Sequence, residues 1–559
     1  SGVTLGLGTG ALANDDGTSN LNTAVGYNAL NSTTTGGWNT GIGYKALEAN
    51  TTLGGNTAVG KEALMTSTGG SGNTAVGSTA LKASTTGDYN VAIGSQAATS
   101  STTAGSNVAI GYSALYSNTT GVSNVAIGRD TLYSNNGGHH TAIGHNALNM
   151  NTTGTDNSAV GAYSLYRNTT GTQNVAVGRE ALEKNTTASD NTAIGYQALE
   201  ENTTGTQNTA VGSLALDANT GGHYNASFGY NSLGSNTTGG QNVAVGYDAL
   251  QANTTAFYNT AVGKGSLYSN TTGTQNTAVG ISTLYFNTTG NNNTALGAYA
   301  LDSSTTASYN TAVGINTLES STTGEYNVAI GQNALSSSTT ASNNTAVGAQ
   351  ALIGNTTGTK NTSIGYQSLY TITTSSYNCA FGAEVLYNTT SGSQNTGIGY
   401  AALYANTTGA NNVAIGTNTL DGNTTGNNNT GVGHSSLGTC TTGYYNTGVG
   451  KGALGLVSTG NLNTAIGESA GNSITSGSNN TVIGYDADAS SATVSNEITL
   501  GNASITSLRI PGLQSGASNG QVLTFNSTNG NITLADAAGG ASAINDLSDG
   551  VTYDSGLSI

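Results

Sequence analysis

The chain has little of what an ordinary globular domain is built from. Only 7% of its 559 residues are charged, against about 25% in typical domains, and it holds one proline, one tryptophan, two cysteines and five histidines. No apolar run approaches the roughly 18 residues that cross a bilayer, so we expect no membrane span. Eleven basic residues against 27 acidic ones give a net charge of −16. Without a basic patch, the composition excludes nucleic acid as a partner.

What the chain does have is a 17-residue unit that repeats along most of its length. The consensus is N-T-A-V-G-Y-x-A-L-x-x-N-T-T-G-x-x, and we count 28 copies, the first beginning at Asn22 and the last at Asn480. One copy, residues 124–139, lacks a single residue. Paired-helix repeats need about 33 residues or more, whereas a unit this short fits one coil of a solenoid. We therefore predict an all-β fold, a parallel β-solenoid (β-roll) of about 28 coils, roughly 130 Å long at ~4.8 Å per coil.

The residue types at each repeat position predict how a coil packs. The fifth position is Gly in all 28 copies, which indicates a positive φ or an approach too close for a Cβ. The fourth is always apolar, as in Val25, and the ninth is Leu in 25 copies, as in Leu30. Alternation along the strand puts the second and fourth positions on one face, and the first, third and fifth on the other. We interpret the fourth and ninth positions as aliphatic rows that fill the coil.

The third and fifth positions, typified by Ala24 and Gly26, carry small side chains in every copy except at Val482. Such a face lets another backbone approach closely, either the opposite wall of a thin coil or a second chain. Two large apolar residues per coil are a small core against the entropy of ordering 17 residues. We therefore expect a trimer of identical chains, with the third and fifth positions or the tyrosines at the contacts.

The N-T-T-G segment at the twelfth to fifteenth positions has the chemistry of a turn, since Asn and Gly tolerate left-handed backbone. Its asparagines also match the N-glycosylation pattern. We favour a turn or a stacked side-chain amide ladder, because a turn also explains the Gly and both Thr. The asparagines considered are Asn118, Asn151, Asn168, Asn185 and Asn202.

The repeat divides the chain into three segments, namely a β-solenoid rod over residues 1–487, a transition out of the solenoid over 488–512, and a small β-hairpin with a linker-like tail over 513–559. The hairpin is predicted from two alternating apolar stretches, residues 521–525 and 531–534. Ser555–Ile559 restates the lead-in Ser1–Leu5. We therefore expect a longer native polypeptide, or copies that follow one another in a filament.

The N-T-A-V-G and N-V-A-I-G cores resemble the head repeats of YadA-like trimeric autotransporter adhesins, over about residues 1–486. That resemblance implies left-handed parallel β-rolls that assemble as trimers and bind host surfaces. The period here is longer than the usual repeat of those heads, and the insert is the N-T-T-G turn. Residues 496–509 resemble the strip ahead of the self-cleaving chaperone in many phage tail fibres, and Gly520–Leu523 resembles the short knobs of such fibres. These two similarities favour a phage tail fibre over a bacterial adhesin.

No catalytic constellation stands out, so we expect no enzyme, no cofactor and no metal site. His139 and His140 fall at the one-residue deletion, where a turn rearrangement is favoured over metal binding. Acidic residues at the seventh position, such as Glu62 and Asp248, occur singly and are read as solvated surface charge. Cys379 and Cys440 occupy different repeat positions three copies apart, too far to form a disulfide.

Tyrosine is the surface feature with most functional promise. Most of the rings fall at the sixth, tenth and last positions of the repeat, and aromatic rows on a rod are suited to stacking on sugar rings. The alternative is that they pack along the strand surface or between chains. The candidate glycan-stacking residues are Tyr27, Tyr44, Tyr112, Tyr116, Tyr133, Tyr166, Tyr247 and Tyr268.

These features predict a structural fibre shaft with an adhesive role, which presents a receptor-binding surface or end to a cell. We expect it outside the cell, on a virion as a phage tail fibre or on a cell surface. The expected partners are further copies of the chain, as a homotrimer or filament, and a cell-surface glycan or receptor. A bacterial surface adhesin or extracellular matrix filament is the alternative, and a polysaccharide depolymerase ranks below both.

Overall fold

The computed structural model describes residues 4–17, 20–509, 521–525 and 532–536. Apart from two five-residue strands at the end, every strand is three residues long. The strands are β1 (Leu5–Leu7), β2 (Thr23–Val25), β3 (Thr40–Ile42), β4 (Thr57–Val59), β5 (Thr74–Val76), β6 (Val91–Ile93), β7 (Val108–Ile110), β8 (Val125–Ile127), β9 (Thr141–Ile143), β10 (Ser158–Val160), β11 (Val175–Val177), β12 (Thr192–Ile194), β13 (Thr209–Val211), β14 (Ala226–Phe228), β15 (Val243–Val245), β16 (Thr260–Val262), β17 (Thr277–Val279), β18 (Thr294–Leu296), β19 (Thr311–Val313), β20 (Val328–Ile330), β21 (Thr345–Val347), β22 (Thr362–Ile364), β23 (Cys379–Phe381), β24 (Thr396–Ile398), β25 (Val413–Ile415), β26 (Thr430–Val432), β27 (Thr447–Val449), β28 (Thr464–Ile466), β29 (Thr481–Ile483), β30 (Ile498–Leu500), β31 (Gln521–Phe525) and β32 (Ile532–Asp536).

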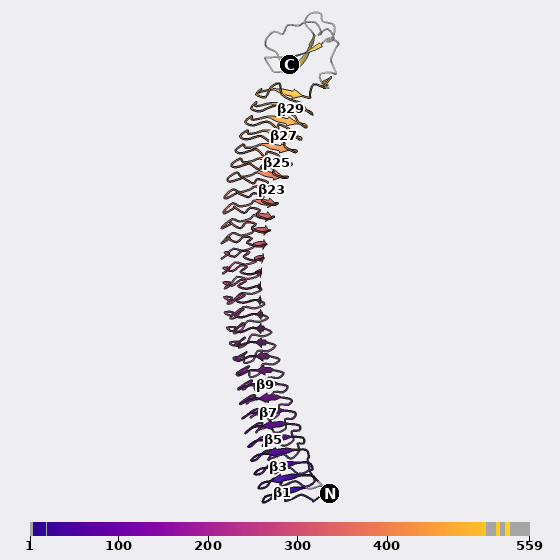
Figure 1. Cartoon of the computed structure of the whole chain (residues 1–559), viewed down its shortest axis with the longest axis vertical. Coiled ribbons are helices and arrows are strands. Elements are labelled where there is room, and N and C mark those ends of the chain that lie inside the picture. The colour runs from indigo at the N-terminus through magenta and orange to yellow at the C-terminus, as the bar shows by residue number, and fades with distance from the viewer. Residues whose placement is uncertain (1–3, 18–19, 510–520, 526–531, 537–559) are drawn as a thin grey trace.

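Strands β1 to β30 form one 30-stranded parallel sheet along a slender, gently curved rod (Figure 1). Each strand pairs with the next one along the chain, and the register places equal repeat positions side by side, as for Thr23 and Thr40. The predicted parallel β-solenoid is therefore confirmed. It has about 29 coils, close to the predicted number, and β1 and β30 extend the stack by one strand at each end of the counted copies. The described residues contain no helix.

After the rod, β31 and β32 pair antiparallel. This pairing is the hairpin predicted from the two alternating apolar stretches. Ser1 and Ser555–Ile559, on which the longer-polypeptide prediction depends, lie outside the described residues.

The interior of each coil holds the third position, so the prediction that the fourth position fills the coil is wrong. Ala193, at the third position of its coil, and Leu199, at the ninth, are fully buried, whereas fourth-position Ile194 points outwards and is 40% exposed. The reason is the thinness of the coil. At third-position Gly41, a Cβ would already lie 3.2 Å from Cγ of Leu30 in the preceding coil, so a branched side chain has no room there.

Two consequences follow for the predicted chain contacts. Because the third position is inside the coil, it is not available as a contact between chains, contrary to expectation. The outward second and fourth positions of β1 to β30 form what we call the outer strand face. The outer strand face points to the outside of the rod, whereas the small side chains of the third position point into the coil.

The fifth-position glycine is required for both of the predicted reasons. Gly212 has a φ of +140°, a conformation that side chains rarely adopt. A Cβ on it would lie 2.3 Å from the carbonyl oxygen of Gly229. The closely approaching backbone is thus the next coil of the same chain, and neither an opposite wall nor a second chain.

Three further positions turn the chain with a positive φ although they are usually not glycine. In the coil that begins at Asn191 they are Gln197 at the seventh position, Leu199 at the ninth and Gln207 at the seventeenth, with φ of 55°, 53° and 58°. A left-handed conformation costs an L-residue roughly 1–2 kcal/mol, which for Leu199 is offset by complete burial. Leucine gives no sequence signal for such a corner, and sequence reasoning did not find it.

A column of first-position asparagines ties the coils together. The side-chain Oδ1 of Asn191 accepts a hydrogen bond from the backbone N–H of Asn208 in the next coil, at 3.0 Å. Its Nδ2 donates to the carbonyl oxygen of Gly205 within its own coil, at 2.9 Å. Both ends of the buried amide are therefore satisfied, which is the condition for burying it without loss of stability.

A second column, at the twelfth position, is the predicted side-chain amide ladder, which is confirmed. Nδ2 of Asn202 donates to Oδ1 of Asn185 at 3.1 Å, and the same bond recurs at every step from Asn118 to Asn287. These side chains are fully buried, so the folded coil closes them to glycosylation. This applies to all the asparagines considered above, Asn118, Asn151, Asn168, Asn185 and Asn202.

The shortened copy keeps both columns. The deletion shortens the exposed turn after the twelfth position. Nδ2 of Asn135 donates to the carbonyl oxygen of Gly137, two residues later, whereas the equivalent acceptor in other coils lies three residues after the asparagine. His140 stands in for the first-position Asn, with Nε2 2.8 Å from the carbonyl oxygen of Gly154 and Nδ1 accepting from the N–H of Asn157 at 3.2 Å. Burial lowers the pKa of His140 to about 4, so the ring is neutral. This is the turn rearrangement predicted at the deletion.

The two cysteines are free, as predicted. Cys379 lies at the second position, on the outer strand face, and Cys440 is buried inside its coil at the twelfth position. Burial raises the pKa of the Cys440 thiol to about 12. Within the described part of the chain, no helix has the length and apolarity to cross a membrane.

Candidate functional site

The candidate glycan-stacking tyrosines lie on the outside of the rod. The tenth-position rings are partly buried and less exposed than those at the sixth position. They are the rings of Tyr116, Tyr133, Tyr166 and Tyr268. The sixth-position rings are about half exposed, those of Tyr27, Tyr44, Tyr112 and Tyr247. Each sixth-position residue follows the glycine that comes directly after a strand, so rings at this position stand in line from coil to coil.

Stacking of coils brings rings at equal positions together. The centroids of Tyr116 and Tyr133 are 4.9 Å apart with the planes 6° from parallel, an arrangement that maximises contact between the rings. Similar stacks join Tyr27 to Tyr44, Tyr230 to Tyr247 and Tyr268 to Tyr285, while Tyr163 meets Tyr166 edge to face. The candidate residues therefore form separate clusters spaced along the rod, and not a single site.

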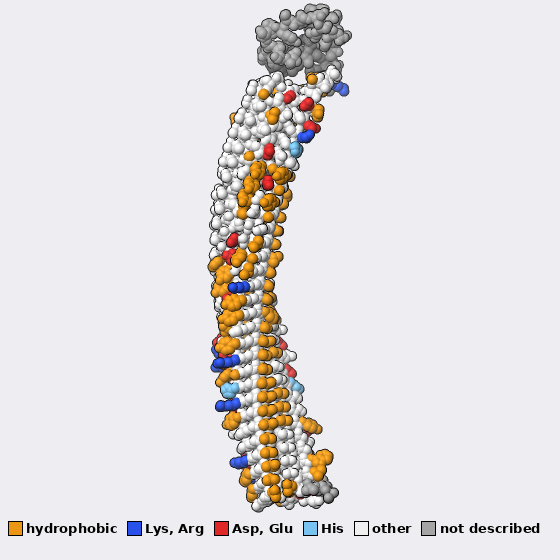
Figure 2. All heavy atoms as spheres, in the orientation of Figure 1, with side chains coloured by type: hydrophobic (Ala, Val, Ile, Leu, Met, Phe, Trp, Pro, Cys, Tyr) orange, Lys and Arg blue, Asp and Glu red, His pale blue; other side chains and the backbone are white. Residues whose placement is uncertain are grey.

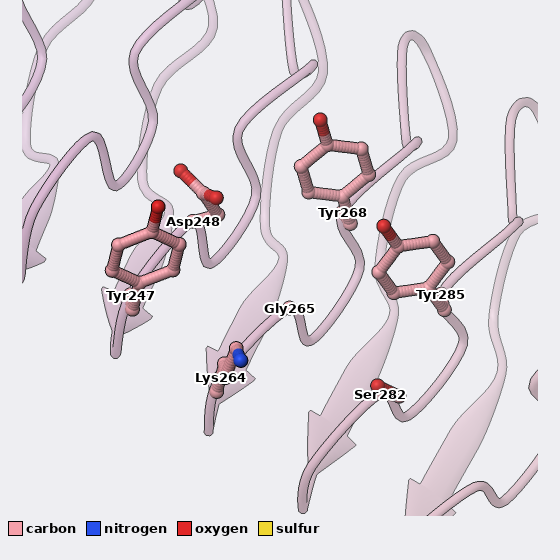
Figure 3. A pocket seen from close by; sticks show the side chains of 7 residues that line it. All are labelled: Tyr247, Asp248, Lys264, Gly265, Tyr268, Ser282 and Tyr285. Atoms are coloured by element: carbon pink, nitrogen blue, oxygen red, sulfur yellow. The ribbon is translucent and has the colours of Figure 1, made fainter.

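One of these clusters surrounds a hollow of about 130 Å³. Figure 3 shows the ring of Tyr247 on one side and the stacked rings of Tyr268 and Tyr285 on the other, with Lys264 and the bare backbone of Gly265 between them. Asp248 and Ser282 complete the lining. The Lys264 ammonium is 5.9 Å from the centroid of the Tyr247 ring.

Sequence reasoning found only Tyr247 and Tyr268 of this cluster. The signal that could have found the rest is Gly265, at a seventh position where neighbouring coils carry Asp248 and Ser282. A glycine there removes a side chain from the surface between the two rows of tyrosines. Lys264 then lies beside that gap because it precedes Gly265 in the chain.

The outer strand face is the second surface with functional promise. Fourth-position Val and Ile side chains stand in line along it, and many are more than a third exposed, among them Ile93, Val160, Val177, Ile330 and Ile466. Hydrophobic side chains form columns along the rod in the space-filling view (Figure 2). Soluble monomers rarely expose apolar patches of more than a few hundred Å², and longer ones mark interaction surfaces.

Acidic side chains occupy the tenth position of three consecutive coils, Glu183, Glu200 and Asp217. Burial, aided by the charges of Glu200 and Glu201, raises the pKa of Asp217 to about 6, and burial also raises the pKa of Glu183. Lys184 pairs with Glu200 at 3.5 Å and also with Glu201. A raised pKa is one property of the general acid of a glycosidase, and here burial is its main cause. Across the described ranges, no three His, Cys, Asp or Glu side chains are grouped to hold a metal ion.

No family model, curated protein or solved structure matches this chain. The outer strand face and the tyrosine clusters are therefore the features of the rod that point to a function.

Proposed function

We propose that the chain is the shaft of a homotrimeric extracellular fibre with an adhesive role, and that this fibre is a phage tail fibre. The shaft presents a receptor-binding surface or end to a host cell. The observation that carries the proposal is the aliphatic row on the outer strand face, which continues from coil to coil along the rod.

The length and spacing of this face favour a second copy of the chain as its occupant. The row repeats once per coil, so a covering surface must carry apolar groups at the same spacing over the same length. Another copy of this solenoid has both properties. Self-association also fits the meagre interior of each coil, where Leu199 and its equivalents are the large apolar side chains and asparagine amides take much of the remaining space. Three chains is the number implied by the resemblance to YadA-like heads.

The test is a mass measurement on a variant with a charged outer strand face. Val160 and Ile194, two coils apart and 36% and 40% exposed, are both changed to Asp. A single chain tolerates these charges because they reach water, whereas an interface that excludes water does not. The matched control changes Thr170 and Thr204, exposed turn residues of the same two coils, to Asp.

We expect the wild type and the control to have three times the chain mass of 55.2 kDa in native mass spectrometry. The Val160→Asp/Ile194→Asp variant should dissociate to single chains that keep their strand content by circular dichroism. A wild type that is a folded monomer would refute the trimer.

The choice of a tail fibre depends on the similarity of residues 496–509 and 520–523 to segments of phage fibres. A gene that lies beside tail-assembly genes supports it, and a gene beside an outer-membrane anchor favours the bacterial adhesin instead. Fluorescent fibres should attach to host cells without releasing sugar. Release of oligosaccharide from host surface polysaccharide, abolished by Asp217→Asn, would favour the depolymerase.

A further inference from the structure

The hollow between Tyr247 and Tyr268 exists because one coil lacks a seventh-position side chain. Gly265 has a φ of +63°, close to the values of the residues that occupy this position elsewhere, so its backbone does not require glycine. Gln367 occupies the same position with a φ of 52°, in a coil whose tenth-position Tyr370 also stacks on the next tyrosine, Tyr387. Glycine at 265 is thus a local departure from the repeat. A Cβ there would lie 3.1 Å from the Tyr285 ring, so the glycine gives that ring room and leaves the surface beside it open.

The walls of the hollow offer aromatic surface. The Tyr268 ring stacks on Tyr285 with centroids 4.8 Å apart and planes 6° from parallel, so one face of Tyr268 is covered, and both rings line the hollow (Figure 3). Tyr247 is held in the same manner by Tyr230, at 5.2 Å. Rings fixed in this way lose little entropy on binding, and the C–H face of a sugar ring packs against them.

Lys264 supplies a positive charge that the chain does not neutralise. Seven of the 11 basic residues form ion pairs with carboxylates. Among the described residues Lys264 pairs with none, and its ammonium is exposed at the edge of the hollow beside the Tyr247 ring. The Asp248 carboxylate lines the same hollow without an ion pair to Lys264, so the ammonium is available to an anionic ligand.

A second Gly-Lys-Gly segment in the same chain shows that this local sequence alone does not leave a lysine unpaired beside a tyrosine-lined hollow. Gly450-Lys451-Gly452 repeats the local sequence of Gly263-Lys264-Gly265 at the same repeat positions. There, however, the Lys451 ammonium is engaged by Glu468 at 3.1 Å, and the tenth position of that coil is Gly455 where the other coil has Tyr268.

The remaining polar groups suit hydroxyls. One carboxylate oxygen of Asp248 accepts a hydrogen bond from Nδ2 of Asn231 at 2.7 Å, which orients the group while leaving its second oxygen to accept another. Ser282 lies on the opposite side of Gly265 with a hydroxyl that both donates and accepts. The hollow is smaller than the roughly 300–1,000 Å³ of pockets that enclose whole ligands, so it suits one ring of a longer glycan.

We propose that this hollow binds a carboxylate-bearing pyranose, a uronic acid unit of an acidic cell-surface polysaccharide. The sugar ring packs against Tyr247 and Tyr268, its carboxylate pairs with Lys264, and its hydroxyls bond to Asp248 and Ser282. The assignment deepens the adhesive role proposed above by naming a ligand class.

The test uses the intact chain and tetrasaccharides of mannuronic, glucuronic and galacturonic acid, each also in a carboxyl-reduced, neutral form. Binding is measured by isothermal titration calorimetry. Lys264→Gln removes the charge with a residue that the sixth position accepts in Gln332. Gly265→Gln fills the hollow with a residue that this position accepts in Gln367, and Lys451→Gln is the matched control.

We expect the wild type to bind at least one uronate tetrasaccharide, and Lys264→Gln to weaken that binding by about tenfold or more, since a charge-assisted bond is lost. The reduced sugar should bind both proteins equally and weakly, Gly265→Gln should abolish binding of either form, and Lys451→Gln should change nothing. Absence of binding by the wild type to all three uronates overturns the proposal, as does equal affinity for charged and reduced sugars. If that happens while the chain is trimeric and attaches to cells, the shaft proposal stands and only the ligand assignment falls.

Discussion

Truncating a buried leucine should destabilise one coil far more than truncating an outward isoleucine beside it. Leu335 is fully buried at a ninth position, and Ile330, at the fourth position of the same coil, is 39% exposed. Leu335→Ala removes three carbon atoms, worth about 0.8 kcal/mol each, or roughly 2.4 kcal/mol before any cavity term. Incomplete relaxation brings such substitutions to about 2–5 kcal/mol. The local opening constant of the coil should therefore rise about 50-fold or more.

Hydrogen exchange read by mass spectrometry is the suitable assay. In a solenoid each coil contacts only its neighbours, so the lesion is local and a single melting temperature would dilute it. Peptides around residue 335 should exchange faster, while coils around residue 100 serve as an internal reference. The comparison is made in the dissociated Val160→Asp/Ile194→Asp chain, where Ile330→Ala should accelerate exchange much less than Leu335→Ala. Equal acceleration by the two, or none by Leu335→Ala, would refute the interior as described.

Three further outcomes are expected. Folding lowers the pKa of His140 from 6.5 to about 4, because the buried ring is held neutral. The coil should therefore be fully stable above about pH 6.5, and its free energy of unfolding should decrease by up to about 3 kcal/mol as the pH falls towards 4. Exchange of peptides around residue 140 should show this loss, and His140→Asn should remove it. Gly212→Ala should disrupt its coil, because the added Cβ would lie 2.3 Å from the backbone of the next coil. Gly452→Asn, the control, should leave strand content and hydrogen exchange unchanged. Equal effects of the two substitutions would contradict the close backbone approach at Gly212. In folded chain secreted from a glycosylating host, Asn202 should be unmodified, as judged by mass spectrometry of the peptide that contains it. A glycan on Asn202 of the folded chain would contradict its burial.

The 17-residue period predicted the fold because strands that stack in register place equal repeat positions side by side, and those positions must then carry similar residues. A 17-residue spacing with one invariant glycine specifies a coil, and the twelfth-position asparagines specify a ladder once the coils are stacked. These inferences need only that equal positions lie side by side, as they do for Asn185 and Asn202.

The direction of the strand faces was not predictable by hydrophobicity alone. Alternation grouped the second and fourth positions correctly, but the usual rule that Val and Ile go inside assigned them to the wrong side of the sheet. The width of the coil decides the matter, since Ala193 fits between stacked leucines and Ile194 would not. The left-handed corner at Leu199 has the same origin, because burial of the side chain outweighs the cost of its backbone.

The tyrosine rows were predictable from the repeat, while the hollow was not. The hollow depends on Lys264 and Gly265 departing from the consensus in one coil, between Tyr247 and Tyr285 on the coils before and after. A repeat analysis averages such departures away, although they are where a regular rod acquires a specific site.

The outer strand face carries its own native probe, which tests directly whether copies of the chain cover it. Cys379 lies on that face, in β23, and reacts with iodoacetamide when water reaches it, whereas Cys440 is enclosed by its own coil and should stay unreactive as long as that coil is folded. If three chains meet through this face, Cys379 should be protected in the wild type. It should become alkylated in the Val160→Asp/Ile194→Asp variant, whose substitutions lie far along the rod. Equal alkylation of Cys379 in both proteins, with Cys440 unreactive throughout, would contradict assembly through the outer strand face.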